Sequence, residues 1–208
     1  MEAVGALPPP GYPVRVEFDE NEPINRLWGV PIFGHFVRWL ILIPHFLVLA
    51  MLGALVGLLQ FVVWYPVLLQ NRYPKWGYDL VGGTYRYTAR VSAYFLMLTD
   101  TYPPFWVTGD HPVTVDYDEM APINPLWGIP LFGIWLRGIL AIPHYIVLAF
   151  LALGVFMVIL VSWIPVLIDG RMATWGYTLL GGWLRWTTRV NAYVLLLTSV
   201  YPPFRFRD

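Results

Sequence analysis

Two pairs of arginines are the clearest candidates for binding chemistry in this sequence. Arg86 and Arg90 stand four residues apart, and so do Arg185 and Arg189. On a helix the members of such a pair lie on one face, within about 40° of each other. A planar guanidinium binds a phosphate through two parallel hydrogen bonds. The spacing therefore predicts two tentative sites for lipid phosphate groups.

An internal ion-pair network is the competing interpretation of these arginines, and the one we favour. Two adjacent acidic residues precede each pair, Asp19 and Glu20 in the first half of the chain and Asp118 and Glu119 in the second. Adjacent residues of a strand point to opposite faces, so neither acidic pair forms an acid/base couple by itself. The sequence also lacks nucleophile-elbow, phosphate-loop and dinucleotide motifs. We therefore expect no enzymatic activity.

Two histidines, His45 and His144, each follow a proline in an Ile-Pro-His string. Two equivalent imidazoles could ligate a haem or a metal ion, because neutral imidazole is a common ligand. The alternative is that each ring satisfies backbone groups that the proline leaves without a partner. No second ligand motif accompanies either histidine, so the structural role is favoured and no cofactor is predicted.

These residues belong to two long apolar runs, Val30 to Leu69 and Ile129 to Ile168. Each run is 40 residues long and contains one charged side chain, Arg38 or Arg137. About 20 apolar residues suffice to cross a bilayer, so the runs predict an integral membrane protein. The composition agrees, with 58% hydrophobic and 12% charged residues. A net charge of zero argues against nucleic acid as a partner, and the absence of cysteine excludes disulfides and thiolate chemistry.

The chain is a tandem duplication. At an offset of 99 residues, 13–105 and 112–204 align without gaps, with 48 identities in 93 positions. We interpret these ranges as two membrane repeat units and 1–12 as a disordered, proline-rich leader. Each unit is expected to contain one short strand (14–18 or 113–117), the long apolar run, and a second helix (about 79–98 or 178–197).

The predicted fold class is therefore mainly α, with two homologous helical units in a parallel pseudo-two-fold arrangement about the membrane normal. The two strands are expected to pair with each other. Because matched arginines give both units the same orientation, each unit needs an even number of crossings. Either the long run and the second helix both cross, or 31–69 forms a hairpin that dips into the membrane while 79–98 lies along the interface. We favour the hairpin, with Gly53 and Gly57 as one possible turn.

Aromatic residues mark the ends of the apolar segments, where interfacial belts place them. The predicted membrane-interface anchors are Trp28, Trp64, Trp76, Tyr78, Trp127, Trp163, Trp175 and Tyr177.

Several strings resemble a bacterial family of membrane domains of unknown function, frequent in actinobacteria and their relatives. They are LIPHFLVLA and AIPHYIVLA (42–50 and 141–149), Arg-x-x-x-Arg-Val-x-Ala-Tyr (86–94 and 185–193), and Leu-x-Leu-Thr-x-x-Tyr-Pro-Pro-Phe (96–105 and 195–204). The resemblance implies a location in the bacterial cytoplasmic membrane and supplies no activity.

The expected function is that of a non-enzymatic scaffold or accessory subunit of a larger membrane complex. Its partners would be membrane lipids and other membrane subunits or a second copy of the chain. The alternatives are a lipid-binding or small-solute transport protein that uses the arginine pairs, and a haem or quinone carrier that uses the histidines.

Overall fold

The computed structural model describes residues 12–20, 22–106, 109–117, 123–129 and 132–206. Residues 1–11 of the predicted leader and the acidic pair Asp118 and Glu119 lie outside these ranges. Tyr12, predicted as part of the disordered leader, is instead buried, and its hydroxyl donates to the carbonyl oxygen of Val200 at 2.9 Å. The first half contains β1 (Val14–Glu17), η1 (Arg26–Gly29), α1 (Phe33–Ile41), α2 (Ile43–Gln70) and α3 (Lys75–Phe95). The second contains β2 (Thr114–Tyr117), η2 (Pro125–Gly128), α4 (Phe132–Val161), α5 (Trp163–Asp169) and α6 (Thr174–Val194).

The long apolar run forms a helix rather than the favoured hairpin. In the first unit a single residue, Leu42, separates α1 from α2; in the second, Ser162 separates α4 from α5. Gly53 lies inside α2, so the expected turn is wrong. A proline inside a helix removes one hydrogen bond and bends the axis, but it does not reverse the chain. Pro66 and Pro143 are tolerated in this way.

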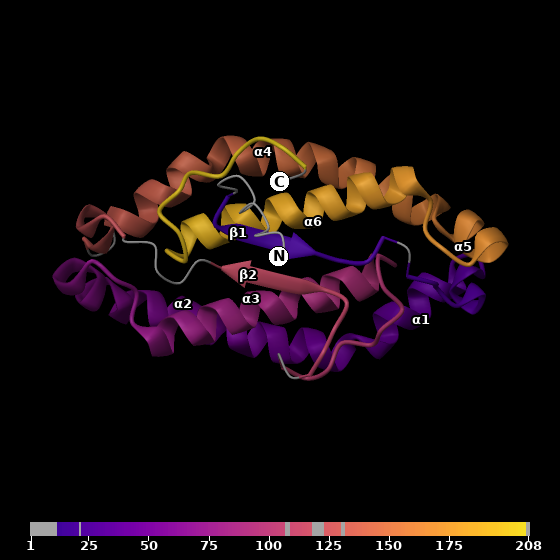
Figure 1. Ribbon diagram of the computed structural model, residues 1–208, viewed down its shortest axis with the longest axis horizontal. Coiled ribbons are helices and arrows are strands. Elements are labelled where there is room, and N and C mark those ends of the chain that lie inside the picture. The colour runs from indigo at the N-terminus through magenta and orange to yellow at the C-terminus, as the bar shows by residue number, and fades with distance from the viewer. Residues whose placement is uncertain (1–11, 21, 107–108, 118–122, 130–131, 207–208) are drawn as a thin grey trace, which may run out of the picture.

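The two strands pair with each other, as the sequence predicted, in an antiparallel two-stranded ribbon. Val16 lies opposite Val115, its own counterpart at the offset of 99 residues. A pseudo-two-fold axis therefore passes through this pair, perpendicular to the ribbon. The matched helices α2 and α4 consequently run in opposite directions, at opposite edges of the molecule (Figure 1). The helices thus lie across the axis and not along it.

Each strand packs on the inner helix of the other unit. β1 contacts α6 and β2 contacts α3, while α3 and α6 also contact each other. The short helices follow the same exchange, because η1 packs on α5 and η2 on α2. At one such contact, a Cβ added to Gly29 would lie 2.4 Å from the backbone nitrogen of Leu167. The two units are therefore interlocked through their N-terminal segments.

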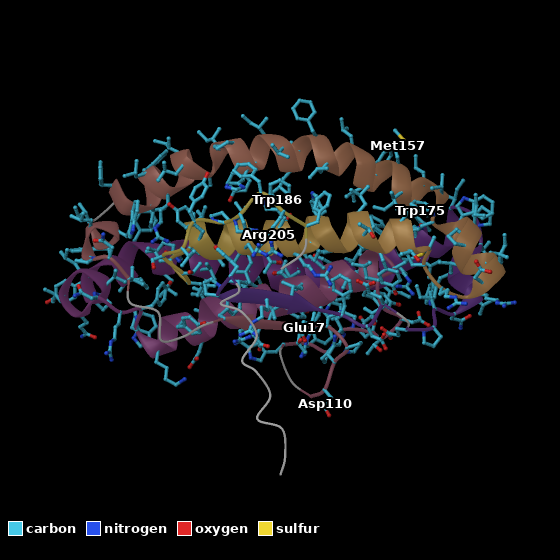
Figure 2. All side chains as sticks on the ribbon, turned by 45° about the horizontal axis from the view of Figure 1, so that its top comes forward. Glu17, Asp110, Met157, Trp175, Trp186 and Arg205 are labelled. Atoms are coloured by element: carbon cyan, nitrogen blue, oxygen red, sulfur yellow. The ribbon has the colours of Figure 1, made fainter. Side chains whose placement is uncertain are left out.

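The surface is divided between apolar helices and a polar ribbon. α2 and α4 are long and apolar enough to cross a membrane, and only 22% of the most apolar window in either helix is buried. The outer face of the ribbon exposes Arg15, Glu17 and Asp116. Figure 2 shows Glu17 and Asp110 projecting away from the side on which Met157 of α4 lies. One broad face is thus polar, and the helices along both edges are apolar.

Candidate functional site

The first member of each predicted arginine pair bonds to the other unit's strand. Arg86 of α3 donates its Nε–H to the carbonyl oxygen of Val115 at 2.9 Å, and Arg185 of α6 donates to Val16 at 3.0 Å. The Arg185 guanidinium also lies 4.1 Å from the ring centroid of Phe18, close enough for a cation–π interaction. Arg86 and Arg185 thus each form a hydrogen bond between the two units.

The second member of each pair is placed differently in the two units. Arg90 donates to the carbonyl oxygen of Val113, the residue before β2, at 3.3 Å. Its counterpart Arg189 donates to the carbonyl oxygen of Arg205 at 3.1 Å, in the C-terminal segment. Both side chains are buried. The predicted lipid-phosphate sites therefore coincide with internal contacts to backbone carbonyl oxygens.

One of the predicted ion pairs forms across the two units. Glu20 of the first unit lies 3.9 Å from Arg185 of the second, through Oε1 and Nη2. From the sequence, both partners of each pair were expected in one unit, and the exchange of strands is the reason for the difference. Asp19 is exposed, and the matched acidic residues of the second unit lie outside the described ranges.

His45 is enclosed by aromatic residues of its own unit. One ring nitrogen, Nδ1, bonds to the hydroxyl of Tyr87, and Nε2 bonds to the hydroxyl of Tyr102 at 2.6 Å. Phe105, from the Tyr-Pro-Pro-Phe string, stacks on the imidazole with the ring centroids 4.3 Å apart. Both nitrogens are therefore bonded to tyrosine hydroxyls, and not to the backbone groups beside the proline that the sequence suggested as partners.

His144 has the same surroundings with one hydrogen bond fewer. Trp186, the counterpart of Tyr87, donates its Nε1–H to Nδ1 at 3.0 Å, and Phe204 stacks on the ring at 3.8 Å. Tyr201 instead donates its hydroxyl to the carbonyl oxygen of Leu140 at 2.9 Å. The Nε2 atom is buried without a hydrogen bond. Over the described ranges, no group of three or more metal-ligating side chains is found.

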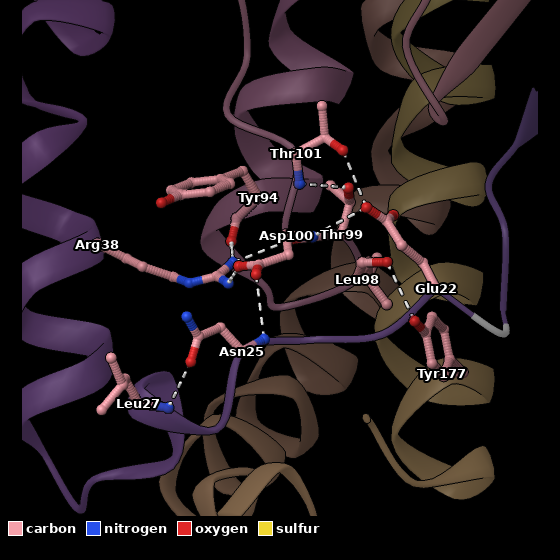
Figure 3. Close-up of polar contacts among 10 residues, drawn as sticks. All are labelled: Glu22, Asn25, Leu27, Arg38, Tyr94, Leu98, Thr99, Asp100, Thr101 and Tyr177. Atoms are coloured by element: carbon pink, nitrogen blue, oxygen red, sulfur yellow. Dashed lines mark hydrogen bonds and ion pairs between the residues drawn. The ribbon is translucent and has the colours of Figure 1, made fainter. Parts of the chain in front are cut away.

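A buried arginine that the sequence analysis did not select organises each unit. Arg38 of α1 is fully buried, and its Nη1 donates to the carbonyl oxygens of Tyr94 at 2.5 Å and Thr99 at 2.9 Å (Figure 3). Its Nη2 donates to Oδ1 of Asp100 at 2.6 Å. The guanidinium lies between the rings of Trp28 and Tyr94, at 4.8 and 4.2 Å.

This arrangement caps the C-terminal end of α3. The last carbonyl oxygens of a helix lack partners within it and carry partial negative charge, so a cation is favourable there. Asp100 extends the network, because its Oδ2 accepts the backbone N–H of Asn25 at 3.0 Å. Glu22 accepts from the backbone N–H of Asp100 and from the Thr101 hydroxyl. The network thereby ties the segment before η1 to the end of α3 (Figure 3).

The second unit repeats the arginine but not its carboxylate. Arg137 is fully buried and donates Nη1 to the carbonyl oxygens of Tyr193 at 2.5 Å and Thr198 at 2.8 Å. It lies between the rings of Trp127 and Tyr193, each 4.7 Å away. The residue matched to Asp100 is Ser199. The Nη2 and Nε atoms of Arg137 are buried without hydrogen bonds.

The family follows from a comparison of the sequence with family models. The model described as "Domain of unknown function (DUF4389)" matches residues 34–107 and 133–205, which together make up more than half of the chain. The chain belongs to the DUF4389 family. No curated protein and no solved structure matches it.

The two DUF4389 matches start inside α1 and α4 and end after the Tyr-Pro-Pro-Phe strings. Each match therefore includes one buried arginine, one enclosed histidine and the inner helix. Both strands and both short η helices precede the matched regions. The segments that interlock the units thus lie outside the region that defines the family.

The predicted interface aromatics of the DUF4389 units fall into two groups. Trp76 and Trp175 are exposed at the starts of the inner helices, and Trp64 and Trp163 are half-buried. Tyr78 and Tyr177 are instead buried, and the hydroxyl of Tyr177 donates to the carbonyl oxygen of Leu98 at 3.1 Å. Trp28 and Trp127 pack on the buried arginines. Tyr78 and Tyr177 are thus internal, whereas Trp28 and Trp127 are half-buried against the guanidinium groups.

Proposed function

We propose that this protein lies in the bacterial cytoplasmic membrane and acts there, without catalytic activity, as a scaffold or accessory subunit of a larger membrane complex. The observation that carries the proposal is the exposure of two apolar helices along opposite edges of the molecule. A continuous apolar patch of this kind is typical of a surface in contact with lipid or partner helices. Lipids, other membrane subunits and a second copy of the chain are the partners that fit it.

The described polar side chains support the absence of catalysis. Arg38, His45, Arg86 and Arg185 all contact backbone or aromatic groups within the chain. A catalytic group needs to reach a substrate, with its reacting atoms about 3 Å away. The same internal contacts argue against the two alternatives, in which these arginines bind a solute or the histidines bind haem or quinone.

The charges on the ribbon favour one orientation in the membrane. If α2 and α4 crossed the bilayer, Arg15, Glu17 and Asp116 would lie near its centre. Placing a charged side chain there costs about 2.5 to 3.5 kcal/mol of free energy for each residue. With the pseudo-two-fold axis along the membrane normal, the ribbon faces water and both helices lie in one leaflet. This orientation also keeps matched arginines of both units on one side, as the sequence analysis required.

Cysteine labelling tests the orientation, because the natural sequence has no cysteine. Arg72→Cys and Arg171→Cys place exposed thiols at opposite ends of the molecule, and Thr114→Cys places one on the ribbon. A membrane-impermeant maleimide applied to one side of sealed vesicles should label all three or none. Labelling of positions 72 and 171 from opposite sides would establish that the helices cross.

Gentle extraction from native membranes, followed by mass spectrometry of everything that co-purifies, tests the accessory role. Defined membrane proteins at a fixed ratio to this chain are the expected result. The protein isolated alone, at every detergent concentration that keeps it folded, would contradict the proposal. A visible absorption band in the same preparation would instead favour the carrier alternative.

A further inference from the structure

The two buried arginines differ in one way that bears on ligand binding. In the first unit, Nη2 of Arg38 reaches a carboxylate, Oδ1 of Asp100, at 2.6 Å. In the second unit, the matched position is Ser199, which carries no negative charge. A second carboxylate near the Arg38 network, Glu22, is matched by Ala121, which lies outside the described ranges. The second unit therefore has no acidic residue at either of the two matched positions.

The side of the Arg137 guanidinium without partners has the geometry of an oxyanion site. Nε–H and Nη2–H form one edge of the guanidinium, and the two N–H bonds on that edge are parallel. Both nitrogens of Arg137 are buried and have no hydrogen bond. Trp127 and Tyr193 cover the two faces of the guanidinium, at 4.7 Å each. An incoming anion would thus meet two donors held in a fixed plane.

The position that the anion would occupy lies next to the surface. In the first unit the Asp100 side chain is 26% exposed while it bonds to the buried arginine. In the second unit Ser199 is half-buried and the next residue, Val200, is exposed. Replacing a carboxylate by a hydroxymethyl group removes volume at this position. An oxyanion from outside would approach the guanidinium at this position, beside Tyr12, whose hydroxyl donates to the carbonyl oxygen of Val200 at 2.9 Å.

We infer that Arg137 binds one phosphate group from outside the chain, where Arg38 binds the internal carboxylate of Asp100. A buried guanidinium without a negative partner is unfavourable, and a phosphate offers two oxygens to the Nε and Nη2 donors. The group comes from an anionic lipid headgroup or from free phosphate, since the chemistry is shared. Only the lipid source depends on the proposed membrane location.

The test uses the full chain and a pair of reciprocal substitutions. Ser199→Asp supplies the missing carboxylate, and Asp100→Ser removes the existing one. Native mass spectrometry counts the phosphatidylglycerol molecules retained on chains released from nanodiscs that contain it, and calorimetry with inorganic phosphate in neutral detergent measures the free anion. We expect one bound phosphate group in the unsubstituted chain, none in S199D and two in D100S. In S199D the affinity should fall by about tenfold or more, as expected for the loss of a charge-assisted hydrogen bond.

The two binding measurements distinguish a lipid headgroup from free phosphate. Retained phosphatidylglycerol that follows this order identifies a lipid ligand, and saturation by inorganic phosphate in the same order identifies free phosphate. Equal counts in the three proteins, or no binding of either probe by the unsubstituted chain, would overturn the inference. Circular dichroism of each variant shows whether it is folded. If D100S does not fold, the comparison of S199D with the unsubstituted chain is sufficient. The proposed accessory role is unaffected by either result with inorganic phosphate.

Discussion

Arg185, in the second unit, donates its Nε–H to the backbone carbonyl oxygen of Val16, in the first, at 3.0 Å. The pseudo-two-fold axis passes between Val16 and Val115, and Arg86 makes the reciprocal bond to Val115. A short ribbon has few side chains of its own to bury, and a two-stranded hairpin alone is at best marginally stable in water. The arginines therefore hold the ribbon against the inner helices, and through it they hold the two units together.

Arg185→Met should loosen this contact between the units. The substitution keeps most of the side-chain length but removes the bond to Val16 and the charge above Phe18. We expect a loss of about 1 to 3 kcal/mol in the free energy of unfolding. Denaturation in mixed micelles, followed by tryptophan fluorescence, measures it. Arg15→Met, on the exposed face of the ribbon, is the matched control and should change stability by less than about 0.5 kcal/mol. If both substitutions lowered the free energy of unfolding equally, Arg185 would not hold the ribbon against the inner helix.

The helices and strands of this fold are easier to predict from the sequence than the elements on which each of them packs. The inner helices, expected at 79–98 and 178–197, form at Lys75–Phe95 and Thr174–Val194. The exchange of strands is not predictable, because two similar units offer β1 two similar docking surfaces. Only the three-dimensional packing decides between them. The hairpin prediction failed for a different reason, since Gly53 and Gly57 are accommodated inside the unbroken helix α2.

Gly34→Ala should be far more damaging than alanine at another glycine of the same apolar run. A Cβ at Gly34 would lie 1.8 Å from the carbonyl oxygen of Trp28, and backbone atoms cannot turn aside as a flexible side chain can. The cost should be about 3 kcal/mol, at the upper end for overpacked sites. Gly53→Ala is the control, because nothing lies within 4 Å of the added atom. Thermal unfolding in detergent compares the two variants; similar midpoints would show that η1 and α1 can separate freely.

His111 should make the stability depend on pH. Burial, and secondly the positive charge of Arg90, lower the pKa of His111 below its usual value of 6.5. The unfolded chain therefore takes up a proton at a higher pH than the folded chain does. The free energy of unfolding should fall as the pH drops below about 6.5 and level off below the folded-state pKa. Protonation of Nδ1 would also break its bond with the Val113 N–H, which is 3.0 Å long.

His111→Asn isolates this contribution, because an asparagine oxygen can accept the same N–H but does not titrate. Unfolding midpoints measured from about pH 7.5 to pH 5 should decline more steeply for the unsubstituted chain than for H111N. Other histidines titrate equally in both proteins, so the difference between the curves reports on position 111. Parallel curves would mean that the imidazole is hydrated in the folded state.

The candidate site was only partly accessible from sequence. Arg38 and Arg137 are the only charged residues in the two apolar runs, and a charge within such a run is by default a functional hypothesis. This feature of the sequence is sufficient to identify Arg38 and Arg137 as candidate site residues. Their partners could not be inferred, because Arg38 bonds to carbonyl oxygens 56 and 61 residues further along the chain. The asymmetry between Asp100 and Ser199 has meaning only once the arginine is known to face both positions.

Tyr87→Phe should destabilise the first unit through His45. The hydroxyl of Tyr87 bonds to Nδ1 of the imidazole, and both side chains are fully buried. Without the hydroxyl, one ring nitrogen loses its partner in a place that water does not reach. We expect a loss of about 1 to 3 kcal/mol in the free energy of unfolding, the usual cost of a buried polar group left unsatisfied. Tyr65→Phe, at an exposed position of α2, is the control and should have little effect. If Y87F is as stable as Y65F, the histidine does not depend on this bond, and Tyr102 and Phe105 suffice to hold it.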